Sequence, residues 1–148
     1  MPTTIQETEL VINGRYRASV IPLINGAKRS IDLIMFEWRW YKQDPSSDAS
    51  LINQALLRAM RRGVRVRAIV NNATQMQALK AVGFDVRTND AGTLLHSKSI
   101  IFDAECVVMG SHNLTNNAMR ANIETSLIVR NEAIAKQMCA YFNSLWQS

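Results

Sequence analysis

The stretch "LLHSKSIIFDAECVVMGSHN", residues 94–113, predicts two β-strands, because it holds two short runs rich in Ile, Val and Phe. The few residues between the runs, near Asp103 and Ala104, leave no room for a helix, so the two strands should form an antiparallel hairpin. His96 and Lys98 interrupt the first run and, being two residues apart, share one face of the strand. An imidazole and an ammonium side by side in an otherwise apolar strand are a candidate functional pair.

Upstream of this hairpin, the sequence alternates between strands and helices. Residues 30–38, 64–70 and 84–87 are strand-like apolar runs, and helical patterns over residues 51–62 and 74–83 lie between them. Such alternation is typical of right-handed crossovers between parallel strands. Joined to the hairpin, it predicts an α/β fold with a mixed, largely parallel sheet sandwiched between helices.

The two ends of the chain add one strand and one helix each. A short strand is expected at Leu10–Ile12 and a helix from there to Lys28, with Pro22 tolerable only in the first turn of that helix. Residues 122–129 should form a last strand, and residues 131–146 a closing amphipathic helix. Five apolar side chains of the closing helix are expected to face the core: Ile134, Met138, Tyr141, Phe142 and Leu145.

The composition is that of an ordered globular domain, with 47% hydrophobic and 20% charged residues. No repeat or low-complexity segment divides the chain, so residues 1–148 are expected to form one domain. Cys106 and Cys139 lack metal-ligand spacing and are expected to be free thiols. No apolar run is long enough to cross a membrane and no signal peptide is recognisable. A cytoplasmic location without membrane insertion is therefore expected, with export left open if a leader has been removed.

The net charge of +5 comes mostly from arginine, which supplies 12 of the 17 basic residues. Arginine favours polyanionic partners because guanidinium groups bind phosphate oxygens as a fork, although a generally basic surface would give the same charge. Arg65 and Arg67 share one face of their strand and are candidates for contacts with a nucleic-acid backbone. Trp38 and Trp40 are candidates for stacking on bases, while a lipid interface, a dimer contact or core packing fits them equally well.

Further polar residues gather around the histidine–lysine pair in the predicted sheet. Gly110, Ser111 and Asn113 follow the second strand of the hairpin, and Glu124 lies in the last strand. This set suits phosphoryl transfer without a metal: histidine attacks phosphorus, lysine and asparagine hold the non-bridging oxygens, and the carboxylate fixes the imidazole. Neither a metal-ligand set nor a cofactor motif accompanies these residues, so no metal and no cofactor is predicted.

These residues and their spacing resemble the HKD signature of the phospholipase D superfamily. The signature runs without a gap as His96-x-Lys98-x4-Asp103-x6-Gly110-Ser111-x-Asn113. Glu124 stands where that family places its downstream carboxylate, and the segments "ALLRAMRRGVRVRAIVNN" and "LKAVGFDVR" look like the family's helix-to-strand connections. The resemblance covers most of the chain and is to the short, single-motif Nuc-type members, which are bacterial endonucleases.

The resemblance implies an active site built from two facing HKD motifs, and therefore a homodimer in which two His96 residues meet. One His96 would form a covalent phosphohistidine, while the second would protonate the leaving oxygen and then activate water. Lys98 and Asn113 would neutralise the phosphoryl oxygens, and Glu124 would bind the imidazole of its own or of the opposite motif.

Supporting roles are expected for the remaining residues of the signature. Asp103 has the opposite strand parity to His96 and lies at the turn, so a structural role is predicted for it. Gly110 provides a flexible backbone point, and Ser111 should lie beside the catalytic groups. His112, at the variable position, is expected to be an exposed polar residue near the site.

The preferred interpretation is a metal-independent phosphodiesterase that acts on nucleic acid, either DNA or RNA, because the charge is arginine-rich and the chain is small. A phospholipase D or phosphatidyl transferase acting on lipids is the alternative among enzymes, and the tryptophans keep it open. The alternative outside enzymes is a non-catalytic, dimeric nucleic-acid-binding module. The complete His, Lys, Asn and Glu set argues against that module, because a binding protein needs no nucleophile.

Overall fold

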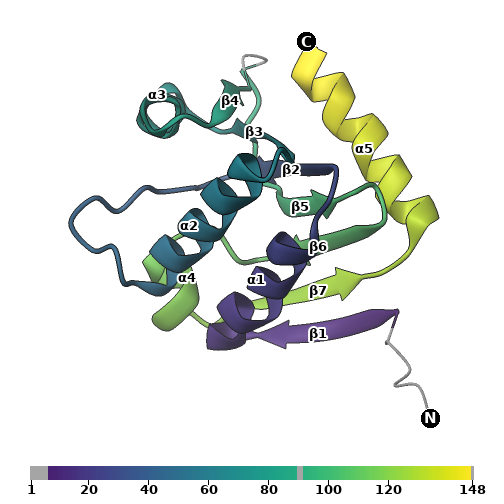
Figure 1. Ribbon diagram of the computed structural model, residues 1–148, viewed down its shortest axis with the longest axis horizontal. Coiled ribbons are helices and arrows are strands. Elements are labelled where there is room, and N and C mark those ends of the chain that lie inside the picture. Colours follow the sequence, from purple (N-terminus) through teal and green to yellow (C-terminus); the bar gives the residue numbers. More distant parts are fainter. Residues whose placement is uncertain (1–6, 90–91, 148) are drawn as a thin grey trace.

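A computed structural model describes residues 7–89 and 92–147, which form a seven-stranded sheet with helices against both faces (Figure 1). The strands are β1 (Thr8–Ile12), β2 (Ser30–Met35), β3 (Arg65–Val70), β4 (Asp85–Thr88), β5 (Lys98–Phe102), β6 (Cys106–Gly110) and β7 (Thr125–Val129). The helical elements are η1, a 3-10 turn (Asn13–Arg15), and the α-helices α1 (Tyr16–Gly26), α2 (Asp48–Arg61), α3 (Ala73–Val82), α4 (Asn116–Arg120) and α5 (Glu132–Gln147).

The sheet is mixed, as predicted, but the expectation that it is largely parallel is wrong. The strand order is β1-β7-β6-β5-β2-β3-β4. Within the described chain, β2–β3 and β3–β4 pair in parallel, and the other four pairings are antiparallel. Parallel pairing is confined to the part where helices cross between strands, because the tight turn between β5 and β6 can only reverse the chain. The hairpin docks antiparallel on β2, which places β5 in the middle of the sheet.

The hairpin turn lies where the sequence predicts it. Asp103 and Ala104 both have positive φ angles, 55° and 54°, and Glu105 N donates to Phe102 O at 2.9 Å. Positive φ at both central residues is typical of the type I′ turn, whose twist matches that of the strands it joins.

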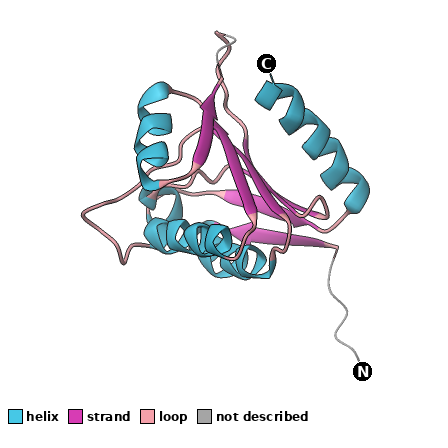
Figure 2. Ribbon diagram, turned by 45° about the horizontal axis from the view of Figure 1, so that its top comes forward, coloured by secondary structure: helices cyan, strands magenta, loops and turns pink. Residues whose placement is uncertain are grey.

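The two faces of the sheet are covered unequally (Figure 2). Helices α1 to α4 pack on one face around a large core, whereas α5 lies alone on the other. α5 buries Ala135, Phe142 and Trp146 against β2, β3, β5 and β6. Of the side chains predicted to face inward, Ile134 and Tyr141 are 38% and 52% exposed. This part of the prediction is wrong because α5 turns the next residue in each case, Ala135 and Phe142, toward the sheet.

Among the residues that the structure describes, none covers the β7 and β1 side of the sheet face on which α5 lies. Leu10 on β1 and Leu127 on β7 point to this face and are 60% and 38% exposed. Apolar side chains of this size are usually buried, so this open strip is a distinctive surface of the chain.

Pro22 lies in the interior of α1, not in its first turn as expected. A proline there removes one intrahelical hydrogen bond. The buried side chains of the helix, Tyr16, Val20 and Ile24, anchor it on the sheet. Burial of these three side chains holds the helix together despite the missing donor.

The short helix α4 is not predicted from the sequence. It has five residues, too few for a periodic pattern, and the Thr115 side chain caps it by accepting from Ala118 N at 3.2 Å. The last strand therefore starts at Thr125, and Glu124 precedes it rather than lying within it.

Candidate active site

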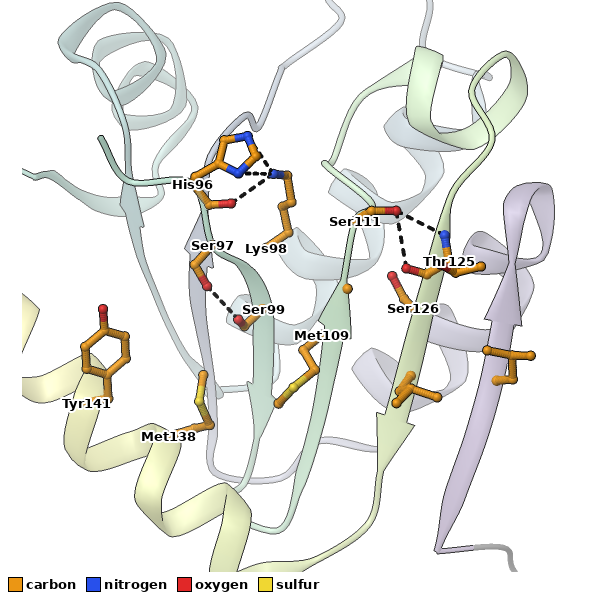
Figure 3. A pocket seen from close by; sticks show the side chains of 13 residues that line it. His96, Ser97, Lys98, Ser99, Met109, Ser111, Thr125, Ser126, Met138 and Tyr141 are labelled. Atoms are coloured by element: carbon orange, nitrogen blue, oxygen red, sulfur yellow. Dashed lines mark hydrogen bonds between the residues drawn. The ribbon is translucent and has the colours of Figure 1, made fainter. Parts of the chain in front are cut away.

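The predicted His96–Lys98 pair is a direct contact at the start of β5 (Figure 3). Lys98 Nζ lies 3.1 Å from Nδ1 and 3.2 Å from Nε2 of His96, and it donates to the His96 carbonyl at 2.9 Å. The ring of Phe36, just after β2, lies 4.8 Å from the His96 ring and 5.2 Å from Lys98 Nζ, measured to its centroid. Phe36 was not among the predicted site residues, because its contact with His96 joins strands that are distant in sequence.

Lys98 is partly withdrawn from water. Burial lowers the pKa of Lys98 below its ordinary value, and the negative charge of Glu124 partly opposes that shift. A cation with less surrounding water is attracted more strongly to an anion, because the local dielectric constant is lower. Lys98 is therefore suited to hold a negatively charged group beside the imidazole.

Gly110, the last residue of β6, and the following Ser111 lie beside the start of β7 in the sheet. A Cβ atom on Gly110 would collide with the Ser126 backbone and side chain and with the Thr125 carbonyl, so this position requires the close approach that glycine permits. Ser111 Oγ accepts a hydrogen bond from Thr125 N at 3.0 Å. Its hydroxyl group can donate to Glu124 Oε1 or to Thr125 O, each of which lies 3.3 Å away. Ser111 thus ties Glu124 to the end of β6, in agreement with its predicted supporting position.

Asn113 is fixed to the segment that follows β2. Its Oδ1 accepts from Glu37 N at 3.1 Å, and Leu114 N donates to Glu37 O at 3.0 Å. Within residues 7–89 and 92–147, the Asn113 Nδ2 group donates to no other group. The side chain is therefore held by its oxygen, with its two N–H donors left for a ligand.

Glu124 lies immediately before β7 and is held by its backbone. Asn13 N donates to Glu124 O at 2.9 Å, and Glu124 N donates to Asn13 Oδ1 at 2.8 Å. The carboxylate contacts Ser111, and no hydrogen bond between Glu124 and His96 is present in the part of the chain that the structure describes. Its charge nevertheless acts on Lys98.

A groove of about 850 Å³ opens beside these residues (Figure 3). Its polar end is lined by His96, Ser97, Lys98, Ser99, Gly110 and Ser111. Its apolar walls are Leu10, Met109, Leu127, Met138 and Tyr141. Asn113 and Glu124 are not among the lining residues, so a single chain brings only part of the predicted set together around the groove.

Asp103 is at the opposite end of β5 from His96, and its predicted structural role agrees with this position. Its carboxylate accepts backbone hydrogen bonds from Lys28, Arg29 and Ser30 at 2.9, 2.7 and 2.9 Å. Partial burial alone would raise the pKa of Asp103, but these backbone donors outweigh it and the pKa falls below its ordinary value. Asp103 therefore fixes the start of β2 against the hairpin turn.

His112 is a core residue, and the expectation that it is exposed is wrong. Its side chain is 1% exposed and stacks on Tyr16 with ring centroids 4.5 Å apart. Nδ1 lies 2.7 Å from Ser126 Oγ, and Nε2 lies 2.9 Å from Asn13 O. Burial lowers the pKa of His112, and the Asn13 contact and the charge of Glu124 partly oppose this. With both ring nitrogens engaged inside the core, His112 supports the fold next to Asn113.

The structure does not bring Arg65 and Arg67, the predicted phosphate contacts, together with His96. Both lie at the start of β3, where Arg65 pairs with Ser30, whereas Lys98 pairs with the other end of β2. The Arg67 side chain is 13% exposed, and its Nε lies 3.1 Å from Asp32 Oδ1. Its guanidinium also stacks over Phe142, 4.8 Å from the ring centroid, so Arg67 holds α5 on the sheet. Arg65 is exposed and lies at the opposite end of the sheet from this site, so its predicted role stays a prediction.

Trp38 cannot stack on a base, because its side chain is 1% exposed. Its ring packs 4.8 Å from Phe84, and Nε1 donates to Asn53 Oδ1 at 2.7 Å. The alternative of core packing is therefore correct for Trp38. Trp40 is half-buried and lines a second, smaller cavity of about 380 Å³.

Membrane-spanning helices and clusters of metal ligands are both absent from the described residues. No helix in them combines the length and the apolar character that a membrane crossing requires. Among the same residues, no three His, Cys, Asp or Glu side chains cluster as potential ligands of a metal ion. Cys106 and Cys139 are both free thiols, as expected.

Relatives with known structures share this fold. Nuc from Salmonella typhimurium, described as a phospholipase D family member, superposes with a TM-score of 0.77 and 25% identity over 95% of each chain. NucT from Helicobacter pylori superposes with a TM-score of 0.74 at 17% identity, covering 95% of this chain and 96% of that one, which shows the fold alone.

Sequence relatives belong to longer proteins. A mitochondrial cardiolipin hydrolase from Xenopus laevis is 33% identical over 128 residues, and a 5′-3′ exonuclease, PLD3, from Xenopus tropicalis is 30% identical over 159. These matches cover 82% and 96% of this chain, but only 57% and 32% of the two relatives. The family model described as "Cardiolipin synthase, PLD-like domain" matches residues 20–146. With that match over most of its length, the HKD residues in place and the fold shared with Nuc, the chain belongs to the phospholipase D superfamily.

Proposed function

We propose that this protein is a metal-independent phosphodiesterase that cleaves nucleic acid through a phosphohistidine intermediate. The observation that carries the proposal is the contact of Lys98 Nζ with the His96 ring, 3.1 Å from Nδ1, at the polar end of an open groove. A nucleophile and a cation at this spacing can contact the same phosphoryl group, the imidazole at phosphorus and the ammonium at a non-bridging oxygen.

The reaction would proceed in two displacements. First, a His96 ring nitrogen forms a bond to phosphorus, the bond from phosphorus to the leaving oxygen breaks, and a second imidazole gives its proton to that oxygen. Next, water loses a proton to the second imidazole and attacks phosphorus, which releases the phosphomonoester and restores His96. Lys98 and the free N–H donors of Asn113 would stabilise the charge on the phosphoryl oxygens in both steps.

The second imidazole requires a second copy of the chain. One chain supplies one His96 to the site, and its other histidine, His112, is buried with both nitrogens engaged. The groove beside His96 is open toward the exposed Leu10, Leu127 and Tyr141. We propose that a second copy packs on this face, because an isologous contact there would bury the apolar strip and bring the two His96 residues together. Glu124, bound to Ser111 rather than to its own His96, would then be available to the imidazole of the second copy.

Nucleic acid is favoured as the substrate by the net charge of +5 and by the similarity to a 5′-3′ exonuclease. Lipid is the second candidate. It is favoured by the apolar groove walls and by the similarity to a mitochondrial cardiolipin hydrolase. Both substrates contain the same phosphodiester, so the same residues would perform either reaction.

The test is a cleavage assay in excess EDTA with single- and double-stranded DNA, RNA and cardiolipin vesicles. The unsubstituted protein is compared with His96→Ala. Lys136→Ala serves as a surface control, since Lys136 is exposed and forms an ion pair with the equally exposed Glu132 one turn earlier on α5. We expect cleavage of nucleic acid that falls at least about 10³-fold in His96→Ala and is unchanged in Lys136→Ala.

Each alternative has its own result. If only the cardiolipin vesicles are hydrolysed, the substrate is a lipid rather than a nucleic acid. Cleavage that requires an added divalent metal would contradict the histidine mechanism. Binding of nucleic acid with no cleavage under any condition would favour a binding module. A protein that remains monomeric at micromolar concentration while fully active would contradict the shared site.

A further inference from the structure

A second cavity, of about 380 Å³, lies at the same end of the sheet as His96. One wall is the segment that follows β2, with Arg39, Trp40 and Tyr41, and the other is the first turn of α3 with Asn72 and Gln75. None of these residues takes part in the reaction proposed above. The cavity is therefore a separate feature that the phosphoryl chemistry leaves unexplained.

The cavity is connected to the catalytic pair by one short segment of chain. Phe36 packs against His96, Glu37 holds Asn113, and Trp40 follows three residues later. Four residues of extended chain span at most roughly 14 Å, so Trp40 lies within reach of a strand of a few nucleotides whose phosphate is at His96.

The walls of the cavity are fixed before any ligand arrives. Tyr41 Oη accepts from Asn116 N at 2.8 Å, and Gln75 Oε1 accepts from Trp38 N at 2.9 Å. The Trp40 ring packs against the main core, with its centroid 6.4 Å from that of Phe84. A rigid aromatic wall costs little entropy when a ligand stacks on it, which favours binding.

The chemistry of the walls matches a flat ring with polar edges. Trp40 and Tyr41 offer aromatic surface, while the side-chain oxygens of Asn72 and Gln75 are engaged by backbone N–H groups. That arrangement leaves their amide NH₂ groups as donors. Arg39 Nη2 lies 2.6 Å from Glu37 Oε2, so the positive charge of Arg39 is largely balanced. A neutral base is therefore favoured over a phosphate as the ligand of this cavity. An acyl chain would make no use of the two amides.

We propose that this cavity binds one nucleobase of the substrate strand, with Trp40 as the stacking surface. This inference rests on the proposed nuclease function and adds a specificity subsite to it. Stacking on an aromatic side chain is tolerant of base identity, so the subsite would recognise the presence of an unpaired base rather than a sequence. It would favour single-stranded over double-stranded substrates.

The experiment measures kcat/KM in EDTA for a single-stranded oligonucleotide and for bis(p-nitrophenyl) phosphate, which carries no base. The variants are Trp40→Ala, Trp40→Phe and Gln77→Ala, the last being an exposed residue of α3 that does not line the cavity. We expect the ratio of oligonucleotide to ester kcat/KM to fall about 10-fold in Trp40→Ala, equivalent to about 1.4 kcal/mol. Trp40→Phe should keep most of the ratio, and Gln77→Ala should keep all of it.

An abasic nucleotide moved along the oligonucleotide then identifies the occupant. One abasic position should lower kcat/KM of the unsubstituted protein by the same factor and have no further effect in Trp40→Ala. Equal effects at every position, or a parallel fall in ester cleavage, would overturn the inference, as would a Trp40 effect confined to cardiolipin vesicles. If the unsubstituted protein cleaves neither substrate, the proposed function fails and this inference with it. Normal cleavage that is insensitive to Trp40 removes this inference alone.

Discussion

Arg29 and Asp103 hold each other through two hydrogen bonds across 74 residues of sequence. Arg29 N donates to Asp103 Oδ1 at 2.7 Å, and Arg29 Nη2 donates to the Asp103 carbonyl at 2.8 Å. The same guanidinium reaches Glu105 Oε1 at 2.9 Å. The start of β2 is thereby attached to the turn of the β5–β6 hairpin, which sets the register that brings Phe36 to His96.

Replacing Asp103 with Ala should destabilise the protein without removing a catalytic group. The three backbone donors would lose a charged acceptor, and we expect a loss of about 1–2 kcal/mol in the free energy of unfolding at pH 7. The pKa of Asp103 is lower in the folded protein than its ordinary value of 3.8. The stability that Asp103 contributes is therefore fully present above pH 3.8 and is lost as the pH falls through its folded-state pKa. Urea denaturation at pH 7 and pH 3 measures both effects. An equal loss in Asp85→Ala, an exposed residue of β4, would show that the effect is not specific.

Gly110→Ala should disturb the junction between β6 and β7. The added methyl group has no space against Ser126, so we expect a loss of about 1–3 kcal/mol, as for other overpacked sites. Gly26→Ala is the matched control, because a Cβ atom there meets nothing within 4 Å. Thermal denaturation of the two variants compares them directly, and equal stability would refute the close-approach explanation.

His112 should make stability depend on pH. Burial lowers its pKa in the folded state, so below about pH 6.5 the unfolded chain takes up more protons and the free energy of unfolding decreases. The slope from this one group is at most about 1.4 kcal/mol per pH unit, and it ends once the folded-state pKa is passed. His112→Gln should be less stable at pH 7.5 and lose less stability on going to pH 5.5. An identical pH slope in both proteins would contradict the buried, neutral histidine.

Lys98→Gln should reduce catalysis while leaving the fold intact. Loss of the positive charge beside the transferred phosphoryl group should lower kcat about 10²- to 10³-fold, as removal of other transition-state donors does. Lys98→Arg should recover part of the activity, because the charge returns on a group of different shape. Steady-state kinetics with bis(p-nitrophenyl) phosphate measure these changes, and full activity of Lys98→Gln would exclude the proposed role.

The contact between His96 and Lys98 could be predicted because its geometry is local. His96 and Lys98 are two residues apart on one extended segment, and Asp103 lies in a turn that its neighbours define, so strand parity alone separates their roles. The mixed character of the sheet likewise follows from crossovers in one half and a hairpin in the other.

Some of the incorrect expectations depended on partners distant in sequence. His112 is buried because its Nε2 meets Asn13, 99 residues away, and Arg67 is engaged by Asp32 and by the closing helix. Likewise, the balance of parallel and antiparallel strands depends on which strand the hairpin joins. A single sequence carries no local signal for such choices.

The stereochemical course at phosphorus shows directly whether His96 forms a covalent intermediate. A chiral phosphorothioate diester is hydrolysed in ¹⁸O-water by the unsubstituted protein, and the configuration of the product is determined. Two successive in-line displacements through a covalent intermediate on His96 restore the original configuration, whereas one direct attack by water inverts it. A phosphohistidine intermediate on His96 should give retention. Inversion would contradict the phosphohistidine intermediate, and with it the role assigned to His96.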